Sequence, residues 1–179
     1  MDAFLRVWYL LALLFIATYL TVLWFVFGPS SPWYAVMLAW GTASLEPTLG
    51  ALLMRRVPRQ RFRVPTGERV LHRIVGVAIF DWLLDVFGWN RRVVKPIRGF
   101  SGTRAGLRSL EQHARAGAIA HGACFAIHVL LAVLALFSTR PWIGALWMLL
   151  PGVVIHLYPV LLQRSTMLRL QPLLDKSGS

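Results

Sequence analysis

Cysteine is nearly absent from this sequence. The chain of 179 residues has a single one, Cys124, and it lies inside an apolar run. One cysteine excludes an internal disulfide framework and a thiol-rich metal site. The sequence therefore predicts neither disulfide bonds nor a cysteine-based metal centre.

Acidic residues are scarce as well. Seven Asp and Glu stand against nineteen Lys and Arg, which gives a formal net charge of +12. In a soluble protein this excess would suggest nucleic acid, but here nearly all basic residues lie between or beside apolar runs of membrane length. Basic residues near a bilayer surface attract anionic headgroups, at about 1 kcal/mol each. We therefore expect contacts with membrane lipids, including anionic headgroups, and with partner membrane proteins, and none with nucleic acid.

Several familiar catalytic motifs are missing. The sequence has no Gly-x-Ser-x-Gly elbow, no glycine-rich phosphate loop before a Lys-Ser/Thr pair, and no His-x-x-x-x-Asp box of the soluble-loop acyltransferases. Its five histidines are too few and too scattered for a membrane di-iron hydroxylase. The sequence thus predicts no metal site and no cofactor.

Long apolar runs dominate what is present. Apolar residues make up 57% of the chain, more than a soluble core of this size can bury. At a rise of about 1.5 Å per residue, a helix of about 20 residues crosses a hydrocarbon layer of about 30 Å. The sequence predicts an all-α membrane protein, one domain over residues 1–179, with four transmembrane helices at 7–27, 33–54, 116–139 and 142–163.

The distribution of basic residues predicts the orientation. Fourteen of the nineteen Lys and Arg lie in the segment 55–115, between the second and third runs. Loops rich in Lys and Arg stay in the cytoplasm. With both termini inside, eighteen basic residues are cytoplasmic and only Arg140 is outside. We predict a multi-pass protein of the inner (plasma) membrane, with both termini and the basic loop 55–115 in the cytoplasm.

Within this basic loop, the segment from Glu68 to Trp89 is amphipathic. Four charged residues recur at multiples of four and form one polar stripe on a helix: Arg69, Arg73, Asp81 and Asp85. The uninterrupted apolar part, 74–80, is too short to cross a bilayer. We therefore predict one interfacial amphipathic helix on the cytoplasmic side.

Three ionisable residues of three different spans fall at one depth. Glu46, His121 and His156 each lie six to nine residues from the arginines that end their span on the cytoplasmic side. This spacing places all three roughly 9–14 Å from the cytoplasmic end of their helices. His121 could then act as a general base for acyl transfer, with Glu46 or His156 orienting it.

Two structural interpretations of the same residues stay open. Glu46 could end a helix that Pro47 breaks. The two histidines could instead form only hydrogen bonds between helices. His128 lies deeper on the same face as His121, and we interpret it as a packing residue.

Polar residues at the end of the last span and in the basic loop are candidates for substrate binding. Arginines could hold a phosphate or carboxylate of an acyl donor, although arginines after a span often serve only as anchors. The candidates are Arg98, Tyr158, Gln163, Arg164 and Arg169.

A family resemblance rests on several of these residues. They include Gly88-Trp89-Asn90, Arg98-Gly99-Phe100, the span start from Arg115 to His121, and the ending from His156 to Arg164, with its Tyr-Pro-x-x-x-Gln-Arg pattern. Together they resemble the glycosyl-4,4'-diaponeurosporenoate acyltransferase family over about residues 62–170. That family consists of small multi-pass membrane proteins, and the resemblance implies transfer of a fatty acyl group to a sugar hydroxyl of a carotenoid glycoside.

The chain departs from the family pattern near His121. Family members tend to carry a Glu three residues before this histidine, where this chain has Ala118. Acyl transfer then requires Glu46 or Glu111 to supply the carboxylate. Two hypotheses of function follow: a membrane-embedded acyltransferase that acts at the cytoplasmic face on a lipid or lipid-linked glycoside, or a non-catalytic lipid-binding or scaffolding subunit.

Overall fold

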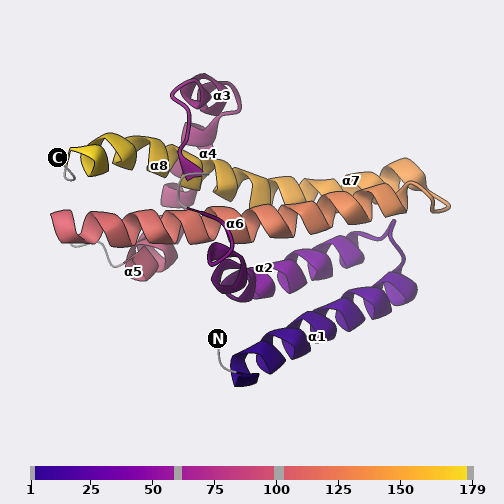
Figure 1. The fold of residues 1–179 in the computed structure, drawn as a ribbon. Coiled ribbons are helices and arrows are strands. Elements are labelled where there is room, and N and C mark those ends of the chain that lie inside the picture. The colour runs from indigo at the N-terminus through magenta and orange to yellow at the C-terminus, as the bar shows by residue number, and fades with distance from the viewer. Residues whose placement is uncertain (1–2, 59–61, 99–102, 177–179) are drawn as a thin grey trace. The chain divides into compact units, whose positions relative to one another are not determined.

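A computed structural model describes residues 3–58, 62–98 and 103–176. Within these ranges the ordered elements are helices, and no strand occurs (Figure 1). The chain divides into two compact units. Unit 1 comprises Met1–Leu52 and Ala120–Leu157, and unit 2 comprises Leu53–Ile119 and Tyr158–Ser179.

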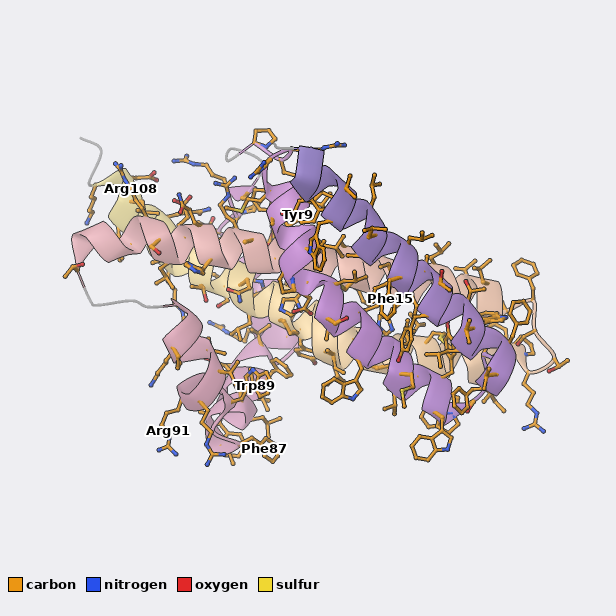
Figure 2. All side chains as sticks on the ribbon, turned by 90° about the horizontal axis from the view of Figure 1, so that it is seen from below. Tyr9, Phe15, Phe87, Trp89, Arg91 and Arg108 are labelled. Carbon is orange, nitrogen blue, oxygen red and sulfur yellow. The ribbon has the colours of Figure 1, made fainter. Side chains whose placement is uncertain are left out.

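Unit 1 begins with a helical hairpin. Helix α1 (Ala3–Phe27) turns at Gly28, which has φ of +74°, into α2 (Pro32–Met54). The two helices lie side by side (Figure 1), and the Tyr19 hydroxyl donates to the carbonyl of Met37 at 3.3 Å. The outer face of α1 is apolar and exposed, as Phe15 shows (Figure 2). Such a face suits lipid rather than water.

The remaining helices of unit 1 come from the second half of the chain. They are the part of α6 (Arg104–Ala135) from Ala120 onward, α7 (Pro141–Pro151) and the π-helical segment η3 (Gly152–Leu157). Buried positions on α2 and α6 carry small side chains or glycine: Ala35, Ala39, Gly41, Ala120 and Ala132. Small residues allow close approach of helices, as in membrane helix packing.

Three helices in the described ranges are long and apolar enough to cross a membrane: Val7–Phe27, Gly106–Ala135 and Pro141–Asp175. The predicted second span, 33–54, forms a helix of 23 residues, but it is not among the three. Its glycines, hydroxyl side chains and Glu46 reduce its hydropathy. The all-helical class is thus confirmed for the described residues, and three helices have the length and composition of membrane spans, whereas the count of four spans stays a prediction.

The predicted bounds of the third and fourth spans differ from the structure. Helix α6 begins at Arg104, so the third apolar run continues a helix that starts within the basic segment, and this helix ends at Ala135. The last run continues as helix α8 (Tyr158–Asp175), twelve residues beyond the predicted end at 163. Leu, Arg, Met and Gln follow residue 163, and these side chains favour helix although they are less apolar.

The prediction of a single amphipathic helix from Glu68 to Trp89 is wrong. The segment forms two short helices, α3 (Glu68–Ile74) and α4 (Val77–Val86). Gly76 between them has φ of +71°, a left-handed conformation that glycine adopts at little cost and that ends a right-handed helix. The polar stripe therefore does not run along one helix.

Unit 2 packs around a small apolar core. The segment before α3, the first part of α6 and helix α8 contribute the core residues Val64, Ala114, Ala118, Met167 and Leu168. Phe62 packs against this core. After α4 follow the π-helical segment η2 (Asn90–Val94) and α5 (Lys95–Arg98). Ala118 is one of the buried core residues, so a Glu at this position would place a carboxylate among apolar side chains.

Candidate functional site

Unit 1 contains a cluster of polar side chains, and the three predicted catalytic residues belong to it. The Oε1 atom of Glu46 lies 2.7 Å from Nδ1 of His121 and 3.0 Å from Nδ1 of His156. The three residues come from α2, α6 and η3, which are distant in the sequence. The depth argument anticipated that these side chains share one level, and the structure brings them into contact.

Helix α2 carries Glu46 without ending there. Pro47 follows directly and lacks the N–H that would bond the carbonyl of Ala43, yet the helix continues to Met54. The interpretation that Glu46 and Pro47 end a broken helix is therefore wrong. One turn before Glu46, the same helix presents Thr42, whose side chain is fully buried.

The π-helical segment η3 carries His156. Pro159 follows in α8 and has no N–H, so the regular ladder of hydrogen bonds cannot pass through it, and the preceding turn widens. Gly152 begins this segment against His128. A Cβ atom at Gly152 would lie 2.7 Å from the Cβ of His128, so only glycine lets the two helices come this close.

Thr42 connects the imidazole rings of His128 and His156. Its Oγ1 atom lies 3.2 Å from Nε2 of His128 and 2.9 Å from Nε2 of His156. Nδ1 of His128 donates to the carbonyl of Met148 at 2.7 Å. All three of these side chains are fully buried. The sequence interpretation of His128 as packing missed its place in this network.

The hydrogen-bond partners of Thr42 are consistent with one neutral tautomer of His156. A carbonyl only accepts, so Nδ1 of His128 carries the hydrogen and Nε2 of a neutral ring accepts. Thr42 has one hydroxyl hydrogen, and the hydroxyl also donates to the carbonyls of Leu38 and Ala39 at 2.8 and 3.1 Å. With this hydrogen directed to Leu38 or to Nε2 of His128, the hydroxyl oxygen accepts from Nε2–H of His156. Nδ1 of neutral His156 then has a free lone pair, which faces Oε1 of Glu46.

Cys124 belongs to the same cluster. Its thiol donates to the carbonyl of Thr42 at 3.2 Å. Ligand atoms of Glu46, Cys124 and His156 all lie within 4.8 Å of one another. The sequence analysis predicted no such grouping, because these residues follow no metal-binding spacing. The available signal was that residues 121, 124 and 128 share one face of a helix.

The predicted substrate-binding residues do not gather in one place with the catalytic candidates. Tyr158, Gln163, Arg164 and Arg169 belong to unit 2. The Tyr158 hydroxyl donates to the carbonyl of Val75 at 2.9 Å, and its ring stacks on Phe80 at 4.9 Å between centroids. Tyr158 thus positions the break between α3 and α4.

Arg164 is engaged by a carboxylate. Its guanidinium donates to both oxygens of Glu68, with Nε at 2.8 Å from Oε2. These hydrogen bonds hold the pKa of Glu68 below its ordinary value, although burial opposes the shift. Arg164 is therefore not a free anion-binding group in this structure.

The other candidates differ in their surroundings. Gln163 packs against Gly117. A Cβ atom added to Gly117 would lie 3.2 Å from Nε2 of Gln163. Arg169 is exposed on α8. Arg98 ends α5, but its side chain and the following residues 99–102 lie outside the described part of the structure.

The fold and the cluster define a class: an all-helical, membrane-type protein with ionisable groups collected among its apolar helices. A sequence model of the glycosyl-4,4'-diaponeurosporenoate acyltransferase family matches residues 55–176. This is more than half of the chain, and the chain belongs to that family. No curated protein and no solved structure matches it.

The family match confirms the resemblance and supports an acyltransferase-type function in carotenoid glycoside modification. It includes four members of the cluster, His121, Cys124, His128 and His156. Glu46 and Thr42 lie outside the matched residues. Glu46, one of the two carboxylates that could substitute for the family's Glu at position 118, lies 2.7 Å from Nδ1 of His121.

Proposed function

We propose that this protein is a membrane-embedded acyltransferase that transfers a fatty acyl group to a hydroxyl of a lipid or lipid-linked glycoside at the cytoplasmic face. The observation that carries the proposal is the contact of Glu46 with His121 at 2.7 Å, inside a membrane-type fold of an acyltransferase family. A carboxylate beside an imidazole is the pair that general-base catalysis requires.

His121 is the proposed base because it is the most accessible imidazole of the cluster. Its side chain is 19% exposed, whereas that of His156 is fully buried. His121 would take the proton of the acceptor hydroxyl while the hydroxyl oxygen attacks the acyl carbonyl. The same proton would then pass to the leaving group of the donor. Glu46 would orient the ring and stabilise the imidazolium.

We further propose that the protein crosses the plasma membrane four times, with Pro32–Met54 as the second span. Both termini would then lie in the cytoplasm. Glu46 and Thr42 of this helix are partnered by buried groups of α6 and η3, which supports a place inside a membrane bundle. The eighteen-to-one distribution of basic residues supports the orientation.

The segment from α4 to η2 supports contact with a lipid surface. Several large apolar side chains of this segment are exposed: Ile79, Trp82, Val86, Phe87 and Trp89. Arg91 follows Trp89 after one residue, and Figure 2 labels Phe87, Trp89 and Arg91 on the same part of the chain. Apolar side chains next to arginine suit the boundary between acyl chains and anionic headgroups.

The test measures the lipid product per folded molecule. We expect His121→Ala to reduce the rate by about 10²–10⁴-fold, the usual contribution of a positioned base. Glu46→Gln should reduce it less, because it removes orientation but leaves the base. His113→Ala is the control, since His113 is an exposed histidine of the same helix, α6. An unchanged product yield in His121→Ala would contradict the proposal.

One observation favours the alternative of a non-catalytic lipid-binding or scaffolding subunit. Arg164 and Tyr158, which the sequence offered as candidates for substrate binding, make structural contacts within unit 2. Mass spectrometry of lipid extracts from cells with and without the gene separates the two functions. The enzyme leaves an acylated product that depends on the gene, and a scaffold does not.

A further inference from the structure

We propose that Glu46, Cys124 and His156 bind a divalent metal ion of the zinc type. The three residues belong to unit 1 and come from α2, α6 and η3. This inference goes beyond the acyl-transfer proposal and does not depend on it, because the ion could serve structure, catalysis or both.

The first argument is distance. One carboxylate oxygen of Glu46, Sγ of Cys124 and a ring nitrogen of His156 all lie within 4.8 Å of one another, and the Glu46–His156 pair is 3.0 Å apart. Zinc binds oxygen and nitrogen at about 2.0–2.2 Å and sulfur at about 2.3 Å, so its ligand atoms lie roughly 3–4 Å from each other. The donor atoms are therefore already close to the separations that an ion requires.

The second argument is that two of these donor atoms lack a hydrogen-bond partner. Oε1 of Glu46 and Nδ1 of His156 are buried, and neither makes a contact with hydrogen-bond geometry in the described part of the chain. His156 is fully buried. A carboxylate oxygen and a ring nitrogen 3.0 Å apart, among apolar helices, need either a proton or a cation between them. A bound metal ion supplies the cation and satisfies both atoms.

The third argument is the support around His156. A histidine that binds a metal ion through one nitrogen usually donates its other ring N–H to an oxygen, which fixes the ring and its tautomer. The Thr42 hydroxyl lies 2.9 Å from Nε2 of His156 and is itself held by the carbonyl of Leu38 at 2.8 Å and by His128. When this hydroxyl accepts from Nε2–H of His156, Nδ1 of His156 is left as the metal-binding atom.

The donor set selects the kind of ion. A thiolate, an imidazole and a carboxylate together suit zinc, whereas magnesium and calcium prefer oxygen ligands alone. Binding requires Cys124 to release its thiol proton and give up its hydrogen bond to the Thr42 carbonyl, so uptake of the ion releases a proton. Three protein ligands leave one position open, as in catalytic zinc sites. His121, which contacts the same Glu46 oxygen, remains outside the ligand set.

The experiment measures metal directly. The full chain is purified in detergent without a polyhistidine tag or chelator, and its metal content is determined by elemental mass spectrometry. We expect about one zinc ion per chain in the wild type and in His113→Ala. His156→Ala and Glu46→Gln should lose at least tenfold in zinc affinity. Thr42→Val should lose about 10–100-fold, the usual effect of removing a group that supports a ligand.

A second readout identifies the sulfur ligand and needs no destabilising change. The wild type is depleted of metal and loaded with Co²⁺, whose bond to a thiolate gives a charge-transfer absorption in the near ultraviolet. We expect this absorption in the wild type and in His113→Ala, and not in Cys124→Ser. Far-ultraviolet circular dichroism checks that each variant is folded.

Two results would overturn the proposal. One is a wild-type protein that carries no metal and takes up neither Zn²⁺ nor Co²⁺, which would leave a shared proton between Glu46 and His156. The other is full zinc binding by folded His156→Ala. Because metal content is read without substrate, a zinc-loaded protein that makes no acylated lipid would contradict the acyl-transfer proposal alone.

Discussion

Arg164 donates hydrogen bonds to both carboxylate oxygens of Glu68, and this pair fixes α3 to α8 within unit 2. The side chains of Glu68 and Arg164 are 22% and 27% exposed, so water weakens the interaction but does not remove it. We expect Glu68→Gln to lower the free energy of unfolding at pH 7 by about 1 kcal/mol. The control is Asp85→Asn, which changes an exposed carboxylate of α4.

The same pair predicts a dependence on pH. Arg164 holds the pKa of Glu68 below its ordinary value of 4.5 in the folded protein. The stabilisation is therefore complete above pH 4.5 and is lost as the pH falls through the lower, folded pKa. Thermal unfolding in detergent should show that the difference between wild type and Glu68→Gln shrinks below this pH. A difference that stays constant to pH 3 would mean that the ion pair does not carry it.

Removing the Thr42 hydroxyl should affect both unit 1 histidines that it contacts. Thr42→Val keeps the shape of the side chain but leaves Nε2 of His128 and Nε2 of His156 without this partner. A buried polar group without a hydrogen bond costs about 1–3 kcal/mol. We expect this loss in chemical unfolding of Thr42→Val, and near wild-type stability in Thr42→Ser. Equal losses in both variants would show that the methyl group, rather than the hydroxyl, matters.

Gly152 offers a test of how closely η3 and α6 pack in unit 1. In Gly152→Ala the new methyl group would lie 2.7 Å from the Cβ and 2.8 Å from the Cγ of His128. Overpacking of this kind costs about 1–3 kcal/mol. Gly67→Ala is the matched control, because nothing lies within 4 Å of the new methyl group there, and its effect should stay within about 0.5 kcal/mol. Indistinguishable melting temperatures for the two variants would refute this packing.

The topology can be read with reporter fusions. We expect fusions after Ser30 and Thr139 to report an outside location and a fusion after Asn90 to report the cytoplasm, in line with the distribution of basic residues. This experiment tests Pro32–Met54 in particular. If that helix does not cross the membrane, Ser30 and Asn90 will lie on the same side.

Patterns of charge and hydropathy were sufficient to predict the helical class and to group Glu46, His121 and His156, which the structure brings into contact. Depth along a helix follows from a fixed rise per residue, so it can be read from spacing alone. The contacts of Thr42 and Cys124 could not be predicted, because they depend on the rotation of α2 and α6 about their axes. A single span that is apolar on all sides carries little information about rotation.

The same limit explains the errors in unit 2. The charged stripe predicted one helix from Glu68 to Trp89, but the backbone conformation of one residue, Gly76, divides it. Arginine at the end of a span suggested a free anion-binding group, yet Arg164 has a partner that is distant in the sequence, Glu68. Pairings between distant segments leave no local signal.

The buried partners of α2 have a consequence for the order in which the protein is made. Glu46 is costly in hydrocarbon by itself, by about 3 kcal/mol on insertion scales. The imidazoles that contact it belong to α6 and η3, which leave the ribosome long after α2. As the proposed second span, this helix would therefore insert stably only after the second half of the polypeptide is made. A nascent chain that stops before Ala120 would lack the groups that hold the helix in the bilayer.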